Sequence, residues 1–208
     1  MDKKIVITIA RGYGSGGKTV GKKLAKELNI PFYDREILYM ASDESGISLN
    51  LFQKNDEDVR KGLFDPSTHK YIGKLLTPED SDFVSKENLF NYQAKIIKDL
   101  AAKGPCVIVG RCADFVLQNN ENVIKTFIWA PHKECVKTVV DMFALSEKEA
   151  DKKIRKIDKH RREHYHYYTC RDWDDVRNYD ICLNSADLGF EGCVKAIKAY
   201  LEVLQEVK

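Results

Sequence analysis

The sequence has no Cys-x-x-Cys pair, no apolar run long enough to cross a membrane and almost no net charge. Its six cysteines lie far apart, so they predict neither a zinc site nor a disulfide framework. A membrane-spanning helix needs about 20 apolar residues, so no membrane partner is expected. The 34 basic residues are balanced by 32 acidic ones, which argues against a nucleic-acid binder driven by bulk charge. We therefore expect a cytoplasmic protein with a local ligand site.

The composition is that of one folded domain. With 208 residues, the chain can bury a substantial core in a single unit. Hydrophobic residues make up 43% and charged residues 32%, a balance that excludes a disordered chain. Strand and helix patterns cover residues 1–44 and 86–208, which we assign to the core. Residues 45–85 have weaker apolar patterning and predict short helices and loops, suited to a flap that closes over a ligand.

Residues 5–20 carry the most informative pattern. β-Branched residues near the start predict a buried strand, a glycine-dense turn follows, and a helical apolar pattern begins after it. Gly12, Gly17, Lys18 and Thr19 fit the phosphate-binding motif Gly-x-x-x-x-Gly-Lys-[Ser/Thr] without an exception. A flexible glycine loop before an ordinary helix would need neither Lys18 nor Thr19 at this register, so we favour the phosphate-binding interpretation.

The residue types in this loop suit a polyphosphate. Glycines can take positive φ angles, so successive backbone N–H groups can turn inward and form a nest for an anion. The helix that follows adds its unpaired N–H groups and the positive end of its dipole. Lys18 would reach the β- and γ-phosphates, and the hydroxyl of Thr19 is placed to ligate Mg²⁺. The expected nucleotide-binding residues are Gly12, Gly14, Ser15, Gly16, Gly17, Lys18, Thr19 and Val20.

Strand patterns alternate with helical patterns along the whole chain. Further strands are expected near residues 30–33, 106–109, 124–129 and 180–183, with helices between them and a last helix over 191–207. This alternation favours an α/β fold of the three-layer P-loop NTPase type, in which helices cover both faces of a parallel sheet of about five strands.

Asp34 falls where the second predicted strand gives way to a helix. Open α/β sheets bind their ligands at this carboxyl edge, so Asp34 and its neighbour Arg35 are candidates for substrate binding. Aspartate is also a preferred cap for a helix N-terminus, and the two roles are compatible.

A strongly basic helix is predicted over residues 151–165, with seven Lys or Arg residues against three acids. Most of these charges are expected to form a solvated face. At 100° per residue, however, Arg161 lies on the apolar side of the helix, with Asp158 close by and Arg155 and Arg162 at the border. Residues 146–170 then form a lid that brings Arg161 onto phosphate. The alternative is an Arg161–Asp158 ion pair within the helix.

Aromatic and histidine residues follow the basic stretch. The rings at 165, 167 and 168 are expected to anchor the lid to the body of the protein, although a base-stacking platform is conceivable. His160, His164 and His166 give only weak support for a metal site.

Taken together, five stretches resemble the cytidylate kinase-like family of P-loop nucleoside monophosphate kinases. They occur in the family's order and span nearly the whole chain: residues 11–18, 31–34, 109–114, 158–161 and 179–185. The resemblance implies that ATP binds on the Lys18 loop, that Arg111 holds a monophosphate acceptor, and that Arg161 acts from the lid. Lys18, Arg111 and Arg161 are accordingly the expected catalytic residues, and the segment 45–85 becomes an acceptor-binding flap.

The chain departs from this family resemblance beside Arg111. Authentic cytidylate kinases carry an acidic residue before the Gly-Arg pair and another directly after it, where this chain has Val109 and Cys112. Asp114 can partly substitute for them in substrate binding. Asp34 becomes the candidate for a magnesium carboxylate. The remaining expected substrate-binding residues are Arg35, Arg155, Asp158 and Arg162.

Three functions remain open at this point, with nucleic-acid binding through the basic helix as a remaining option. The first is transfer of the γ-phosphoryl group of ATP to a nucleoside monophosphate, most simply CMP or dCMP. The second is phosphorylation of a non-nucleotide metabolite. The third is a regulatory module that binds ATP without transferring phosphate. A GTPase is disfavoured because the sequence has no Asn-Lys-x-Asp motif, and the oligomeric state is not predicted.

Overall fold

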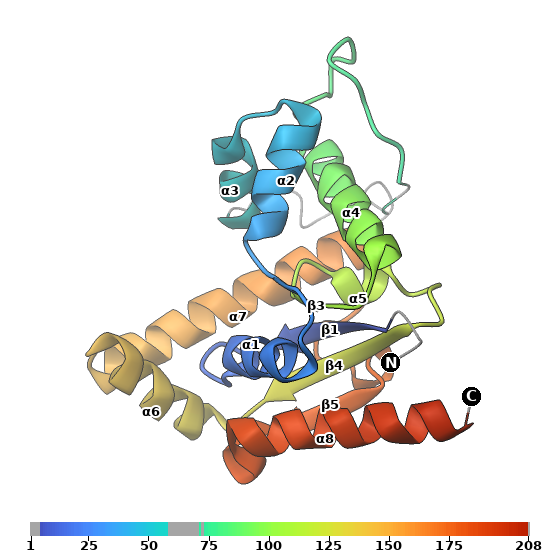
Figure 1. Cartoon of the computed structure of the whole chain (residues 1–208). Helices are drawn as coiled ribbons and strands as arrows, with labels where there is room; N and C mark the ends of the chain where they lie inside the picture. Colours follow the sequence, from blue (N-terminus) through green and yellow to red (C-terminus); the bar gives the residue numbers. More distant parts are fainter. Residues whose placement is uncertain (1–4, 58–70, 72, 208) are drawn as a thin grey trace.

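The computed structural model describes residues 5–57, 71 and 73–207 and has a five-stranded parallel sheet at its centre (Figure 1). The strand order is β2-β3-β1-β4-β5, and every neighbouring pair is parallel. The strands are β1 (Val6–Arg11), β2 (Phe32–Tyr33), β3 (Cys106–Val109), β4 (Val123–Trp129) and β5 (Ile181–Asn184). The predicted parallel α/β fold is confirmed. Because all five strands point the same way, the segments after β1, β2 and β3 meet at one edge of the sheet.

Helices cover both faces of the sheet. Ile7 and Ile9 of β1 belong to the core cluster that packs against α1 (Gly17–Leu28) and α8 (Ser185–Val207). Val6 belongs to the opposite cluster, with Ile97 of α4 (Lys86–Lys103) and Phe115 of α5 (Ala113–Val116). This alternation follows from the two-residue period of a strand, and it explains why the strands read as nearly continuous apolar runs.

Polar caps fix the ends of the two longest helices before β5. The Ser85 hydroxyl accepts the N–H of Asn88 at the start of α4. Ser146 and Glu149 form a reciprocal capping box at the start of α7 (Glu147–Thr169). Helix α8 differs from the prediction: it begins directly after β5 and kinks at Gly189, whereas the apolar stripe became recognisable only from residue 191. None of the helices in the described residues is both long enough and apolar enough to cross a bilayer.

Three helices stand beyond the sheet edge, where α2 (Glu36–Ser45) and α3 (Leu49–Glu57) lie beside the upper part of α4 (Figure 1). Within the segment predicted as a flap, residues 58–70 and 72 lie outside the described residues. In the described part, Phe52 of α3 is fully buried, and the side chain of Asn88 accepts the N–H of Leu76 at 2.9 Å. The structure contains a short helix in this segment, as predicted, and α4 holds the part of the segment near Leu76.

Helix α7 crosses the molecule and is anchored at its C-terminal end, whereas its N-terminal end packs against α6 (His132–Phe143) (Figure 1). The ring of Tyr168 stacks on Phe90 of α4, with centroids 3.9 Å apart and planes 8° from parallel. The hydroxyl of Tyr165 donates to the buried carboxylate of Asp114 at 2.6 Å. The predicted anchoring role of these rings is confirmed. A short 3-10 turn, η1 (Val176–Asn178), leads into β5.

His164 makes the stability of the fold depend on pH. Burial lowers the pKa of this histidine to about 4, assisted by His160 and Arg111 and opposed by Asp56. The unfolded chain binds a proton near pH 6.5, so the neutral buried ring contributes stability above that pH, and this contribution is lost as the pH falls toward 4. We expect the wild type to lose about 3 kcal/mol more than His164→Gln over this range. Urea denaturation at several pH values measures the difference.

His166 provides the matched control for this prediction, because it lies two residues away on the same helix and is 53% exposed. His166→Gln should keep the pH dependence of the wild type. Parallel stability profiles for the wild type and His164→Gln would contradict the assignment.

Candidate functional site

The loop between β1 and α1 presents several backbone amides that have no acceptor in residues 5–57, 71 and 73–207. The first helical hydrogen bond of α1 runs from Val20 N–H to the Gly16 carbonyl at 2.9 Å. The amides of Gly17, Lys18 and Thr19 therefore precede the helical ladder, as the first N–H groups of any helix do. The amides of Gly14 and Gly16 likewise have no acceptor among the described residues. An anion placed in this loop would meet several N–H donors and the positive end of the α1 dipole.

Contacts from other strands hold the loop in this shape. The Ser15 hydroxyl lies 2.9 Å from the carbonyl oxygen of Gly12 and 3.0 Å from that of Ile128 on β4. At the start of α8, the Ser185 hydroxyl donates a hydrogen bond of 2.7 Å to the Ser15 carbonyl oxygen. Gly16 has a φ of 76°, and a Cβ there would collide with the ring of Phe190. The Ser15 side chain thus fixes the shape of the loop, and the amides of the neighbouring glycines are the groups that would meet a ligand.

Lys18 and Thr19 lie in the first turn of α1. The Lys18 ammonium lies 2.5 Å from Oδ2 of Asp34, and its side chain is half exposed. The Thr19 hydroxyl makes no hydrogen bond with the described residues. Asp34 is buried at the carboxyl end of β2, where the strand pattern placed it. The hydroxyl and the carboxylate are oxygen ligands of the kind that Mg²⁺ takes beside a phosphate.

Arg111 lies at the same edge of the sheet, in a strained turn that follows β3. Gly110, Arg111 and Cys112 have consecutive φ values of 76°, 58° and 52°, in the left-handed region. Two non-glycine residues in this region cost roughly 1–2 kcal/mol each, which the surrounding structure must offset. The turn points the side chain inward: Nε donates to the Asp34 carbonyl at 2.9 Å, and Nη1 lies 2.8 Å from Oδ1 of Asp56.

Asp56 is a site residue that sequence reasoning missed. It sits near the end of α3, and its side chain is 35% exposed, whereas that of Arg111 is 6% exposed. Burial alone would raise the pKa of Asp56, but Arg111, His164 and Arg11 outweigh it and hold the pKa below its usual value. His160 of α7 hydrogen-bonds to the Asp56 backbone carbonyl. Asp56 therefore joins α3, Arg111 and α7, and only its place in an acidic cluster marked it in the sequence.

The basic helix docks on the loop through two side chains. The Asp158 carboxylate accepts the N–H of Tyr13 at 2.8 Å, and Nη1 of Arg161 donates to the Arg11 carbonyl at 2.9 Å. The two side chains also pair with each other at 3.2 Å. Burial raises the pKa of Asp158 and lowers that of Arg161. The prediction that Arg161 faces inward is confirmed, and the helical ion pair offered as the alternative coexists with it.

Removing Asp158 should loosen this docking. Asp158→Ala would leave the Tyr13 amide and the Arg161 guanidinium without their acceptor, at a cost of about 1–3 kcal/mol in the free energy of unfolding. Urea denaturation at pH 7 measures the change. Asp174→Ala is the control, because its ion pair with Arg162 is exposed and should be worth less than about 1 kcal/mol. Equal losses in the two variants would refute the docking role.

The other predicted substrate residues lie further from this cluster. Arg155 is exposed and pairs with Asp151, and Arg162 pairs with Asp174 and lies over the ring of Trp173. Arg35 is exposed at the start of α2. Asp114 is buried against Tyr165, where burial raises its pKa. The structure thus brings Lys18, Asp34, Arg111, Asp158 and Arg161 together around the loop, and leaves the roles of Arg35, Arg155, Arg162 and Asp114 as predictions.

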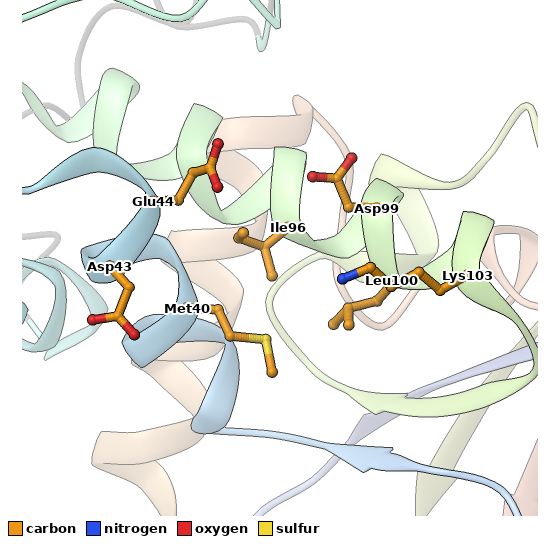
Figure 2. A pocket seen from close by; sticks show the side chains of 7 residues that line it. All are labelled: Met40, Asp43, Glu44, Ile96, Asp99, Leu100 and Lys103. Carbon is orange, nitrogen blue, oxygen red and sulfur yellow. The ribbon is translucent and has the colours of Figure 1, made fainter.

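A separate pocket opens between α2 and α4 (Figure 2). Met40, Ile96 and Leu100 form its apolar part, and Asp43, Glu44, Asp99 and Lys103 add charged groups around it. It shares no residue with the cluster around the loop, so we do not assign the phosphate chemistry to it. No group of three or more potential metal-ligating side chains occurs among the residues that the structure describes.

The sheet order, the amide-lined loop and the cations at its edge together give the chain the fold and the phosphate-loop arrangement of the P-loop kinases. The chain belongs to the cytidylate kinase-like family, whose pattern matches residues 6–187. Membership of this family implies nucleotide binding at the loop.

Named relatives and solved structures agree with this assignment. The chain is 27% identical to the cytidylate kinase of Pyrococcus horikoshii over 205 residues, which cover 98% of this chain and 92% of the relative. It is 27% identical to the cytidylate kinase of Thermococcus kodakarensis over 201 residues, covering 96% and 89% of the two chains.

Among solved structures, an uncharacterized protein of Eubacterium ventriosum matches with a TM-score of 0.70 and 28% identity, covering 95% of this chain and 98% of that one. A gluconokinase of Sinorhizobium meliloti matches with a TM-score of 0.54 and 12% identity, covering 99% and 98%, which shows a shared fold.

Proposed function

We propose that this protein transfers the γ-phosphoryl group of ATP to a nucleoside monophosphate, with CMP or dCMP as the first acceptor to test. The observation that carries the proposal is the meeting of the free loop amides with Lys18, Arg111 and Arg161 at one sheet edge. Phosphoryl transfer needs positioning and charge neutralisation more than a nucleophilic side chain, and these groups supply both. The named cytidylate kinase relatives support the choice of acceptor.

The proposed roles follow the geometry. The loop amides and Lys18 hold the β- and γ-phosphates of ATP, while Arg111 faces the acceptor from the turn after β3. Arg161 approaches from the lid, residues 146–170, and the segment 45–85 closes over the acceptor. Magnesium fits beside Thr19 and Asp34 and would neutralise phosphate charge there. Lys18 must leave Asp34 to reach the phosphates, so nucleotide binding is expected to break that ion pair.

A panel of acceptors tests this proposal. Each is mixed with ATP and Mg²⁺, and ADP formation is followed for CMP, dCMP, UMP, AMP, GMP and a set of hydroxylated metabolites. CMP or dCMP should give the highest kcat/KM. Turnover with a metabolite and none with any nucleoside monophosphate would reject the nucleotide acceptor.

A non-nucleotide acceptor is the second candidate, and one feature favours it. Val109 and Cys112 flank the Gly110-Arg111 turn and are both buried apolar residues, where the resemblance led us to expect acids. Arg111 pairs instead with Asp56 of α3. The acceptor panel separates the two candidates. Binding of ATP without ADP formation from any acceptor would leave a regulatory role.

A further inference from the structure

Arg11, the last residue of β1, sends its side chain toward the turn that carries Arg111. A Cβ at Gly110 would collide with the Arg11 guanidinium, and a Cβ at Gly17 would collide with the Arg11 Cβ. Gly110 also has a φ of 76°, which disfavours any other residue. Two glycines, one in the phosphate loop and one beside Arg111, thus leave the space through which Arg11 extends.

The guanidinium of Arg11 differs from its cationic neighbours because it has no partner within the part of the chain that the structure describes. Lys18 pairs with Asp34, Arg111 pairs with Asp56, and Arg161 pairs with Asp158. The Arg11 side chain makes no hydrogen bond or ion pair with the residues that the structure describes. Only its backbone carbonyl is used, as an acceptor for Arg161. An arginine has five N–H donors, and leaving them unpaired in a partly buried site is costly unless an anionic ligand binds there.

Counted together with Arg11 itself, the charged groups that act on it carry one more positive than negative charge. The pKa of Arg11 is lowered to about 9, mainly by burial and with contributions from Arg161 and Arg111, whereas Asp34 and Asp56 oppose the shift. These four residues come from the lid, the turn after β3, the end of β2 and α3. Arg11 therefore lies between the phosphate loop and the proposed acceptor site, where a phosphate dianion would complete the charge balance.

We propose that Arg11 is a further phosphate-binding residue and that its ligand is a phosphoryl group at the junction of the loop and the acceptor site. The inference rests on the proposed function for its context. The phosphoryl group is either the γ-phosphate of ATP or the phosphate that the acceptor already carries. In both cases Arg11 donates hydrogen bonds to nonbridging oxygens, which a planar guanidinium does in a two-point geometry.

Titration calorimetry on the full chain separates the two sources of phosphate. Arg11→Gln, Arg11→Lys and the wild type are titrated with MgADP, with a nonhydrolysable MgATP analogue, and with inorganic phosphate in the presence of saturating MgADP. If Arg11 holds the acceptor's phosphate, Arg11→Gln should lower the affinity for inorganic phosphate by about tenfold or more, while the affinity for MgADP stays within about twofold of the wild-type value. If it holds the γ-phosphate, the preference for the ATP analogue over ADP should fall by about tenfold. Arg11→Lys should recover part of either loss.

Thermal unfolding tests whether Arg11 acts only by stabilising the fold. Removing an unpaired, partly buried cation should leave the melting temperature of Arg11→Gln unchanged or raise it. Arg177→Gln is the matched control, because Arg177 is 86% exposed and pairs with Asp175.

Three results would overturn the inference. Arg11→Gln could bind every probe as the wild type does, or it could lose the same affinity for every probe, MgADP included. The third is a wild type that binds no inorganic phosphate, together with an Arg11→Gln variant that keeps the wild-type preference for the ATP analogue over ADP. A failure of CMP turnover leaves these readouts intact, so it would count against the proposed function alone.

Discussion

Lys18→Ala is expected to lower the rate of phosphoryl transfer by about 10²–10³-fold while the protein stays folded. The ammonium of Lys18 is the loop's own cation, and it would neutralise charge on the group in transfer. Its loss removes an interaction that strengthens in the transition state, so kcat should fall more than the affinity for MgADP. The measurement is steady-state kinetics with the best acceptor from the panel.

The structure explains why this variant should fold. Lys18 is half exposed, and among the described residues it forms an ion pair with Asp34 alone. Lys23→Ala is the control on the same helix, because the Lys23 side chain is 41% exposed and pairs with Glu191. It should change neither activity nor stability appreciably. Normal turnover by Lys18→Ala would show that the loop is not where the chemistry takes place.

Arg111→Met should lower kcat/KM for the acceptor by about 10²–10³-fold and leave the KM for ATP within about threefold. Arg111 is the most buried cation of the cluster. Its guanidinium makes two contacts in different directions: Nε donates to the Asp34 carbonyl, and Nη1 pairs with the Asp56 carboxylate. A lysine has one charged group on a flexible stem, so Arg111→Lys should restore little activity.

The same variant should also lose stability, because Asp56 would keep a partly buried charge without its partner. The expected loss is about 2–3 kcal/mol, and Asp56→Asn in the Arg111→Met background should recover part of it. Kinetics and urea denaturation of the two single variants and the double variant complete the cycle. If activity falls only in proportion to stability, Arg111 is structural and has no direct role at the acceptor.

Local patterns were sufficient to predict much of this architecture. The apolar strand, the glycines and Lys18 at their register predicted the loop, because each needs only its near neighbours in the chain. The inward face of Arg161 followed from its angular position relative to Ile154 on the helix, and its 19% exposure confirms the prediction.

Such local patterns could not predict the contacts between distant segments of the chain. Arg111 and Asp56 are 55 residues apart, and their pairing depends on a turn whose left-handed conformation at Arg111 and Cys112 no residue propensity favours. The unpaired state of Arg11 was equally hidden, because it depends on which carboxylates the neighbouring cations have already taken. The sequence also offered Arg155 and Arg162 as phosphate-binding residues, and these roles stay predictions: Arg155 pairs with Asp151 of α7, and Arg162 pairs with Asp174, which follows that helix.

The most direct test of the central claim is a crystal structure of the wild type with Mg²⁺ and a nonhydrolysable ATP analogue. We expect the β- and γ-phosphates to lie against the amides of Gly14 and of Gly16 to Thr19, with the Lys18 ammonium moved from Asp34 onto phosphate oxygen. A nucleotide bound elsewhere, or a loop that faces the ligand with its carbonyl groups, would contradict the account.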